Sequence, residues 1–336
     1  MSGYMPLLKV QNLSINFAEN KILRGVSFDI KKGETLALVG ESGSGKSLTA
    51  LSCLGLQPAN ASVAGDILFS EKKIEQKDFR KIRGSRASMI FQEPMTALNP
   101  LHTIGKQIGE MLLRHPEQAA GAVKDLKRAA RDPSATPQDD KIKELLKKVG
   151  LQKFIGRENA YPHELSGGER QRVMIAMAIA ANPDLLIADE PTTALDVTIQ
   201  AKILELLKDL QQQMGMAMLF ITHDLTIVRR IADRVAVMKN GEIVEIGAAG
   251  DVLKNPQHEY TKMLLASEPK GEPLAPAKNA KTIIECKNLK VYFPIKAGIF
   301  KRTSGYVKAV DDVSFTLKEG ASLGIVGESG DRKSVV

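Results

Sequence analysis

Cysteine is almost absent from the sequence, and long apolar runs are absent altogether. The two cysteines among 336 residues, Cys53 and Cys286, lie far apart in the chain. This number supports neither a disulfide framework nor a cysteine-ligated metal site, so we expect reduced, structural thiols. The longest apolar run, Val173 to Ala181, falls short of the roughly 18 residues needed to span a bilayer. We therefore do not expect the chain to insert into a membrane by itself.

The first residues also lack a basic region followed by an apolar stretch, so no signal peptide is predicted and a cytoplasmic setting is expected. Composition is ordinary for a globular protein, with 43% hydrophobic and 26% charged residues, and the length suits about two domains. A net charge of +8 would suit nucleic acid or the anionic inner face of a membrane. A solvated basic surface explains the charge equally well.

A glycine-rich stretch, Gly-Glu-Ser-Gly-Ser-Gly-Lys-Ser at 40–47, follows an apolar run and precedes a helical one. This is the pattern of a phosphate-binding loop between a strand and a helix, whose backbone N–H groups cradle phosphates. Lys46 adds a point charge near the β- and γ-phosphates, and Ser47 offers a hydroxyl to a Mg²⁺ ion. The residues that we expect to bind nucleotide here are Gly40, Ser42, Gly43, Ser44, Gly45, Lys46 and Ser47.

Two adjacent carboxylates end the apolar run Leu185–Ala188. Acids placed there need an explanation, because an unpaired buried charge is costly. A Mg²⁺ ion held by Asp189 supplies one, with Glu190 as the base that orients and deprotonates an attacking water. The alternative is a solvated strand end.

Three further positions have both a functional and a structural interpretation. Ser166, followed by Gly167 and Gly168, caps a helix and predicts a second anion site, or only a capped helix. His223 follows a predicted strand, where it could reach a γ-phosphate or serve the fold. Phe17 could stack on adenine or pack in the core.

The pattern predicts an α/β fold with short strands at 8–17 and 23–30, and a hairpin around Lys239-Asn240-Gly241. Apolar residues at helical spacing in 104–113 and 142–149 predict a helical insertion at about 94–165, with a mobile basic loop inside it. We expect the first domain to span 1–267. A linker rich in proline and charge follows at 268–281.

Beyond the linker the sequence repeats its own beginning. Residues 287–293 echo 11–17, and residues 313–320 echo 26–33. The second loop, at 327–334, has Asp331 and Arg332 where the first has Ser44 and Gly45. A carboxylate repels phosphates and a side chain blocks close backbone approach, so we expect this copy not to bind nucleotide. Residues 282–336 are therefore interpreted as the truncated start of a second domain, too small to fold alone.

The ordered set of motifs resembles the ATP-binding subunits of ABC transporters, from about Leu8 to Ala266. The resemblance implies a P-loop NTPase core with an antiparallel β subdomain and a helical insertion, followed by an incomplete second copy. The stretches at 91–100, 161–165 and 196–200 are similar to the dipeptide, oligopeptide and nickel import branch. The tandem layout is most similar to double-ATPase peptide importers that also take up microcin C. The chain departs from them by lacking most of the second half.

The resemblance also implies roles. Gln92 corresponds to the Q-loop, which senses the γ-phosphate and the membrane partner, and is expected with Ser47 and Asp189 at the Mg²⁺ ion. Asp196 corresponds to the D-loop, His223 to the switch histidine and Phe17 to the adenine-stacking aromatic. It implies a head-to-tail dimer, with itself or with a second ATPase half, in which Ser166 contacts nucleotide held by Lys46 of the other unit. It further implies transmembrane permease subunits, indirect work with a periplasmic or extracellular solute-binding protein, and a peripheral position on the cytoplasmic face of the inner membrane.

We therefore expect an ATPase that powers peptide import. One alternative is a non-transport ABC ATPase acting on nucleic acid or ribosomes, suggested by the positive charge and weakened by the lack of a coiled-coil insertion. Another is a fragment that binds nucleotide with little hydrolysis. The imported solute is not readable from the sequence, because membrane and solute-binding subunits normally select it.

Overall fold

The structure is a computed structural model that describes residues 5–93, 97–113, 137–193, 195–267, 279–297 and 302–326. The chain divides into two units, Met1–Ala194 with Ile199–Ser267, and Leu195–Thr198 with Glu268–Val336. The predicted linker, the basic loop within 114–136 and the second glycine-rich loop lie wholly or mostly outside the described residues.

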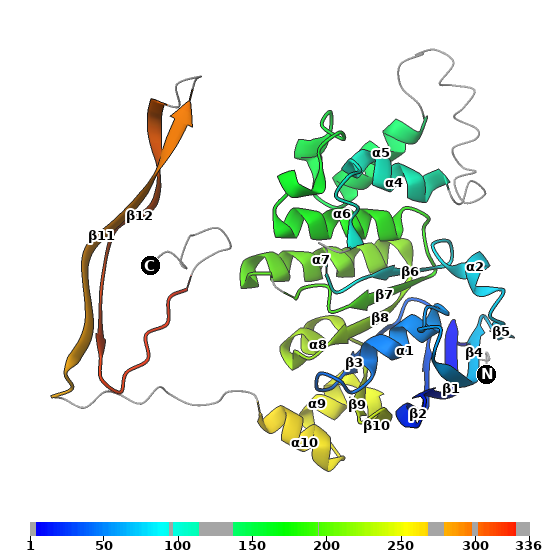
Figure 1. Cartoon of the computed structure of the whole chain (residues 1–336). Coiled ribbons are helices and arrows are strands. Elements are labelled where there is room, and N and C mark those ends of the chain that lie inside the picture. Colours follow the sequence, from blue (N-terminus) through cyan, green and yellow to red (C-terminus); the bar gives the residue numbers. More distant parts are fainter. Residues whose placement is uncertain are drawn as a thin grey trace. The chain divides into compact units, whose positions relative to one another are not determined.

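A six-stranded sheet forms the centre of the first unit, in the order β10-β9-β3-β8-β7-β6 (Figure 1). All neighbours pair in parallel except β9 and β10, which form the antiparallel hairpin predicted at Asn240-Gly241. Both turn residues have positive φ, as a tight hairpin turn requires. The strands are β3 (Thr35–Val39), β6 (Ala87–Ile90), β7 (Leu185–Asp189), β8 (Ala217–Thr222), β9 (Arg234–Lys239) and β10 (Glu242–Ala248).

Both faces of this sheet are buried, which is why its central strands are almost continuously apolar. Along β3, Leu36 and Leu38 face one apolar cluster, whereas Ala37 and Val39 face the other. The helices that follow the sheet strands or flank them are α1 (Lys46–Cys53), α2 (Phe79–Ile82), α7 (Val197–Met214), α8 (Leu225–Ile231), α9 (Ala249–Lys254) and α10 (Glu259–Ala266).

A smaller antiparallel sheet has the order β2-β1-β4-β5. It packs over the apolar cluster that contains Leu36 and Leu38 of β3. Its strands are β1 (Leu8–Phe17), β2 (Asn20–Ile30), β4 (Ser62–Phe69) and β5 (Lys72–Lys73). The alternating sequence of β1 places Leu8, Val10, Leu13 and Ile15 in the core. This is the antiparallel subdomain expected from the sequence.

A helical part lies between β6 and β7 in the chain and groups α4, α5 and α6 together (Figure 1). Its elements are α4 (Ile104–Leu113), α5 (Pro137–Lys148), the short 3₁₀ turns η4 (Gln152–Phe154) and η5 (Pro162–Glu164), and α6 (Gly167–Ile179). The helix predicted at 104–113 is observed there, and the one predicted at 142–149 begins earlier, at Pro137. Among the described residues, no helix is long and apolar enough to cross a bilayer.

The second unit contains the hairpin of β11 (Thr282–Ala297) and β12 (Arg302–Lys318). Its geometry repeats that of β1 and β2. Asn12 and Asn288 have φ of 49° and 52°, and their N–H groups donate to Ser27 Oγ at 2.8 Å and Ser314 Oγ at 2.9 Å. The same bulge thus recurs where the two sequences echo each other. The assignment of 282–336 to a second ATPase domain stays a prediction.

Candidate functional site

The glycine-rich loop connects β3 to α1 and cannot be built from larger residues. Gly40, Gly43 and Gly45 have φ of 153°, 80° and 102°, in the region that L side chains rarely adopt. A Cβ on Gly40 would lie 2.1 Å from the backbone oxygen of Met238. The loop therefore lies directly against β9, and its first glycine makes that approach possible.

The start of α1 is left open by this loop. Gly45 is the N-cap and provides no side-chain hydrogen bond to the first helical N–H groups. Uncapped N–H groups and the positive end of the helix dipole favour an anion. The loop thus meets the backbone requirements of a phosphate cradle.

The side chain of Lys46 reaches back across the phosphate loop to its first residues. Its Nζ donates to the carbonyl of Gly40 at 2.8 Å and to that of Glu41 at 2.7 Å, and the residue is 5% exposed. Burial lowers the pKa of Lys46, and the nearby carboxylates of Glu190, Asp189 and Glu41 oppose that shift. The three carboxylates thus favour the charged ammonium form of Lys46, although its side chain is buried beside the phosphate cradle.

Ser47 and Asp189 bring the loop and the carboxylate pair together. The Ser47 hydroxyl donates to Asp189 Oδ1 at 3.1 Å, and Asp189 is 5% exposed at the end of β7. Burial raises the pKa of Asp189 and Glu190 adds to that shift, whereas the Ser47 hydrogen bond and Lys46 oppose it. A buried carboxylate beside a hydroxyl, with its charge penalised, fits a Mg²⁺ ion, which prefers such oxygen ligands.

The Glu190 side chain contacts three other side chains of the site. Its carboxylate accepts hydrogen bonds from Thr193 Oγ1 at 2.9 Å and from Gln92 Nε2 at 3.3 Å, and lies 3.3 Å from His223 Nδ1. Its backbone has φ of 45°, an uncommon value for a residue other than glycine. The strand therefore turns sharply at Glu190, directly after Asp189.

The parallel register explains why residues from distant segments meet here. Val39 pairs with Thr222, and Asp189 pairs with Ile221. The carboxyl ends of β3, β7 and β8 therefore lie at one edge of the sheet, where open α/β sheets bind ligands. His223 follows β8 directly, and its side chain is 64% exposed, open to a ligand at this edge.

Ser166 begins α6 with the capping arrangement expected from the sequence. Its Oγ accepts from the N–H of Glu169 at 3.4 Å, and its own N–H donates to Glu169 Oε2 at 2.9 Å. Lys153 pairs with the same carboxylate. Gly167 is exposed, whereas a Cβ on Gly168 would lie 2.7 Å from Ile199 Cγ2. Ser166 and Gly167 thus form an exposed loop tip, with Ser166 hydrogen-bonded to Glu169.

Ser47 bonds to Asp189, and the adjacent Glu190 contacts Gln92 and His223. Within the described part of the chain, these contacts do not reach Ser166 or Phe17. Phe17 ends β1, is partly buried and packs against the larger apolar cluster, so its adenine-stacking role stays a prediction. Asp196 belongs to the segment that groups with the second unit, and its role also stays a prediction.

Sequence reasoning missed Thr193, whose hydroxyl contacts Glu190. The signal was present: Thr193 lies three residues after Glu190, and its N–H donates to the Glu190 carbonyl at 3.1 Å, which closes a turn. The close contact between Gly40 and Met238 carried no local signal, because nearly 200 residues separate them.

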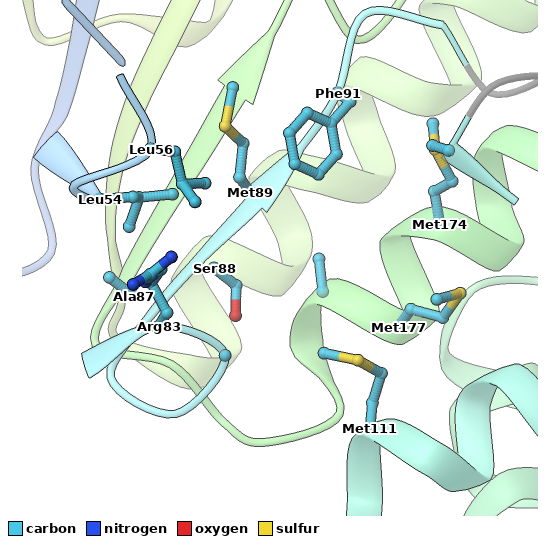
Figure 2. Close-up of a pocket in the computed structure, with 13 residues that line it drawn as sticks. Leu54, Leu56, Arg83, Ala87, Ser88, Met89, Phe91, Met111, Met174 and Met177 are labelled. Carbon is cyan, nitrogen blue, oxygen red and sulfur yellow. The ribbon is translucent and has the colours of Figure 1, made fainter. Parts of the chain in front are cut away.

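A second feature is an apolar pocket between β6 and the helical part (Figure 2). Met89 and Phe91 lie on one side, and Met111 of α4 with Met174 and Met177 of α6 on the other. Phe91 is 43% exposed and directly precedes Gln92. Flexible, polarisable methionines suit a surface that adapts to a partner. The lining also includes Arg83, at the end near Leu54 and Ala87.

Comparison with known proteins decides the family. A family model described as "ABC transporter" matches residues 23–193, about half of the chain. The chain belongs to the ABC transporter family. The match begins within β2 and ends at Thr193, so it includes the phosphate loop, the capped α6 and the carboxylate pair. The family and the P-loop ABC fold expected from the sequence are confirmed.

Curated relatives of this ABC chain include transport proteins of the peptide import branch. It is 52% identical over 340 residues to the "Peptidoglycan transport ATP-binding protein YejF" of Agrobacterium fabrum, covering 98% of this chain and 60% of the relative. It is 42% identical over 368 residues to the "Glutathione import ATP-binding protein GsiA" of Escherichia coli, covering 98% of this chain and 57% of the relative. The chain thus spans about 60% of the length of such relatives.

One similar solved structure is that of the ATP-binding cassette MJ0796, a dimer in a post-hydrolysis state bound to ADP and Pi. The TM-score is 0.58 with 28% sequence identity, and the match covers 72% of this chain and 98% of the other. This likeness supports the arrangement of sheets and helices described above.

Proposed function

We propose that the chain is the ATP-binding and ATP-hydrolysing part of an importer, and that it powers uptake of peptides or peptide-like compounds through an inner-membrane ABC transporter. The observation that carries the proposal is the contact chain at the sheet edge. Ser47 bonds to Asp189, and the adjacent Glu190 is contacted by Gln92 and His223. If the glycine-rich loop served only the fold, nothing would require Ser47, Asp189, Glu190, Gln92 and His223 to meet at one edge of the sheet.

ATP binds, on this proposal, with its phosphates over the loop and the start of α1. Lys46 moves its hydrogen bonds from the Gly40 and Glu41 carbonyls to phosphate oxygens, since it already lies across the loop. Asp189 and Ser47, with Gln92, would hold Mg²⁺, which would neutralise negative charge on the bound phosphates. Phe17 stacks on the adenine.

Hydrolysis follows from Glu190. Its carboxylate accepts a proton from water while the water oxygen forms a bond to the γ-phosphorus and the bond to the ADP oxygen breaks. Thr193 and Gln92 fix one carboxylate oxygen by donating to Oε2, whereas Oε1 faces His223. His223 holds the γ-phosphate in position. ADP and inorganic phosphate are the products.

The site is completed by a second ATPase unit. Ser166 and Gly167 form an exposed tip outside the contact chain of their own unit, and a loop and helix start of this kind can bind an anion. We propose a head-to-tail dimer in which this tip contacts the γ-phosphate held by the partner unit, with Asp196 at the interface. A second copy of the chain is the partner that we put to the test.

Energy reaches the membrane through the pocket of Figure 2. We propose that a short amphipathic helix of a permease subunit docks between β6 and α6, with its apolar face on Phe91 and the methionines. Gln92 follows Phe91 directly and bonds to Glu190. Movement of a docked helix would therefore reposition a residue of the hydrolytic site.

The names of the relatives support import of peptide-like solutes, because they specify peptidoglycan transport and glutathione import. On this proposal the chain lies peripherally on the cytoplasmic face of the inner membrane. A periplasmic or extracellular solute-binding protein delivers the solute to the permease. The relatives give no support to the alternative of a nucleic-acid or ribosome ATPase.

The experiment that tests this function is coexpression with the permease genes, followed by reconstitution in liposomes. Expected results are copurification of the permease with the chain, ATP hydrolysis, and ATP-dependent uptake of a di- or tripeptide supplied with its solute-binding protein. The variant Glu190→Gln should bind the permease and ATP while uptake stops. Hydrolysis by the chain without any permease association, together with salt-sensitive RNA or DNA binding, would contradict the proposal.

A further inference from the structure

The helix α10 contacts the phosphate loop, although 219 positions separate the two residues that meet. The N–H of Glu41, the second loop residue, donates to the phenol oxygen of Tyr260 at 3.2 Å. Tyr260 is 3% exposed. A buried hydroxyl from an element outside the known motifs thus takes a backbone hydrogen bond from the loop itself.

Tyr260 is firmly held, so its hydroxyl is a fixed point. Its ring belongs to the apolar cluster that includes Val39 of β3 and Val252 of α9. The ammonium group of Lys239 lies 4.6 Å from the ring centroid, within the range of a cation–π contact. Ring packing would survive the loss of the hydroxyl, so packing and hydrogen bonding can be separated experimentally.

Hydrogen bonds also hold the start of α10 against β10. Glu245 of β10 accepts from the N–H groups of Gln257 at 2.8 Å and His258 at 3.1 Å. Nδ1 of His258 in turn accepts from the N–H of Tyr260 at 3.1 Å and caps the helix. A hydrogen-bonded path therefore runs from the end of the sheet through α10 to the loop.

The contact between Tyr260 and Glu41 is relevant to nucleotide binding because both backbone polar groups of Glu41 are hydrogen-bonded. Its N–H donates to Tyr260, and its carbonyl accepts from Lys46 Nζ at 2.7 Å. A shift of this backbone segment would move an anchor of the lysine that faces the phosphates. Glu190 follows a different strand, β7, and its side chain contacts Thr193, Gln92 and His223 instead.

We propose that Tyr260 is a positioning residue for ATP binding, which holds Glu41 and thereby the phosphate loop in its binding-competent form. The inference rests on the proposed function, because it concerns the affinity of that same site. Loss of the hydroxyl should raise the Kd and KM for ATP by about two- to tenfold, the range expected for one hydrogen bond. The kcat should stay within twofold of the wild type.

The test is a MgATP titration of the full chain and of Tyr260→Phe, with Tyr306→Phe as the matched control. Tyr306 is a 61% exposed tyrosine on β12, and its substitution should leave the Kd unchanged. Lys46→Ala gives the apparent Kd for MgATP of a chain whose phosphate-binding site is disabled. If the wild type itself fails to bind ATP, the proposed function fails. If the wild type binds and Y260F has the same Kd, the inference alone is overturned.

A double-mutant cycle separates positioning from general destabilisation. Glu41→Pro removes the donor N–H and leaves Tyr260 in place. If Tyr260 acts through that N–H, Y260F raises the Kd in the wild-type background and has no further effect in E41P. An equal rise in both backgrounds would overturn the proposal. If Y260F fails to fold, hydrogen exchange of the wild-type Glu41 amide decides: protection before ATP is added supports the bond, and rapid exchange overturns it.

Discussion

The Ser47 hydroxyl donates a hydrogen bond of 3.1 Å to Asp189, although 142 positions separate the two residues in the chain. Ser47 lies in the first turn of α1 and Asp189 ends β7. The bond therefore ties the phosphate loop to the strand that carries the carboxylate pair. Both oxygens are ligands that Mg²⁺ accepts, so removal of the charge at Asp189 has consequences for stability and for metal binding.

Asp189→Asn should raise the Tm of the metal-free protein at pH 7. Burial raises the pKa of Asp189 above its ordinary value of 3.8, so the folded state binds a proton more readily than the unfolded state. The carboxyl group therefore favours folding most when it is protonated, and this contribution is lost as pH rises from 3.8 through the raised pKa. Thermal unfolding from pH 4 to 8 should show a gap between D189N and wild type that closes toward pH 4.

The same variant should lose its response to Mg²⁺. In the wild type with ATP, added Mg²⁺ should raise the Tm by linkage, because the ion binds only the folded site. In D189N that increase should be abolished. The exposed acid Asp209 of α7 provides the control, since Asp209→Asn should keep both the pH profile and the Mg²⁺ response. An undiminished Mg²⁺ response in D189N would remove Asp189 from the metal site.

Glu190→Gln should lower turnover by about 10²–10⁴-fold, the usual contribution of a general base, while MgATP still binds. The amide is nearly isosteric and can still accept from Thr193 and Gln92, so the loss would come from proton transfer. Steady-state phosphate release measures the effect, and the exposed Glu205 of α7 supplies the control E205Q. Near-normal phosphate release from E190Q would show that another group is the base.

Two glycines of the loop should differ sharply when each is replaced by alanine. Both have positive φ, which costs a non-glycine residue about 1–2 kcal/mol. A Cβ at Gly43 meets no atom within 4 Å, whereas one at Gly40 lies 2.1 Å from the Met238 backbone oxygen. In urea unfolding, Gly43→Ala should cost about 1–2 kcal/mol and Gly40→Ala about 3 kcal/mol or more. Equal losses would mean that β9 does not lie against Gly40.

Met177→Glu should uncouple the chain from its membrane partner. The substitution places a charge in the pocket between β6 and α6, where a docked apolar helix could not pair it. Copurification with the permease should fall at least tenfold, with the Kd for ATP unchanged. Leu113 is apolar and 65% exposed, and it does not line the pocket. Leu113→Glu should therefore leave copurification intact; the reverse pattern would place the docking surface elsewhere.

Much of the fold was predictable because its signals are local. The buried strands β3 and β7 are short apolar runs, Asn240-Gly241 marks a hairpin, and the serine and glutamate of the α6 capping box are three residues apart. Helix limits were less predictable: α5 begins at Pro137, five residues before the predicted start at Ile142. Tertiary packing, rather than local pattern, decides such ends.

Site geometry was predictable only where one motif contains it. The glycine spacing indicated the phosphate loop, and the family resemblance brought Gln92, Glu190 and His223 to one site. The positive φ of Glu190, the Met238 contact at Gly40 and the Tyr260 bond to Glu41 depend on how distant segments pack. No single stretch of sequence encodes them, so they required the three-dimensional structure.

The measurement that tests the shared site most directly is the ATPase activity of an equimolar mixture of Lys46→Ala and Ser166→Asp chains. Aspartate still caps α6 but repels a phosphate, so each variant alone should be inactive. In a mixed dimer, Lys46 of one chain meets Ser166 of the other and one intact site forms. We predict that mixing restores hydrolysis well above the sum of the separate proteins. Activity no greater than that sum, or full activity of S166D alone, would contradict a site shared between two copies.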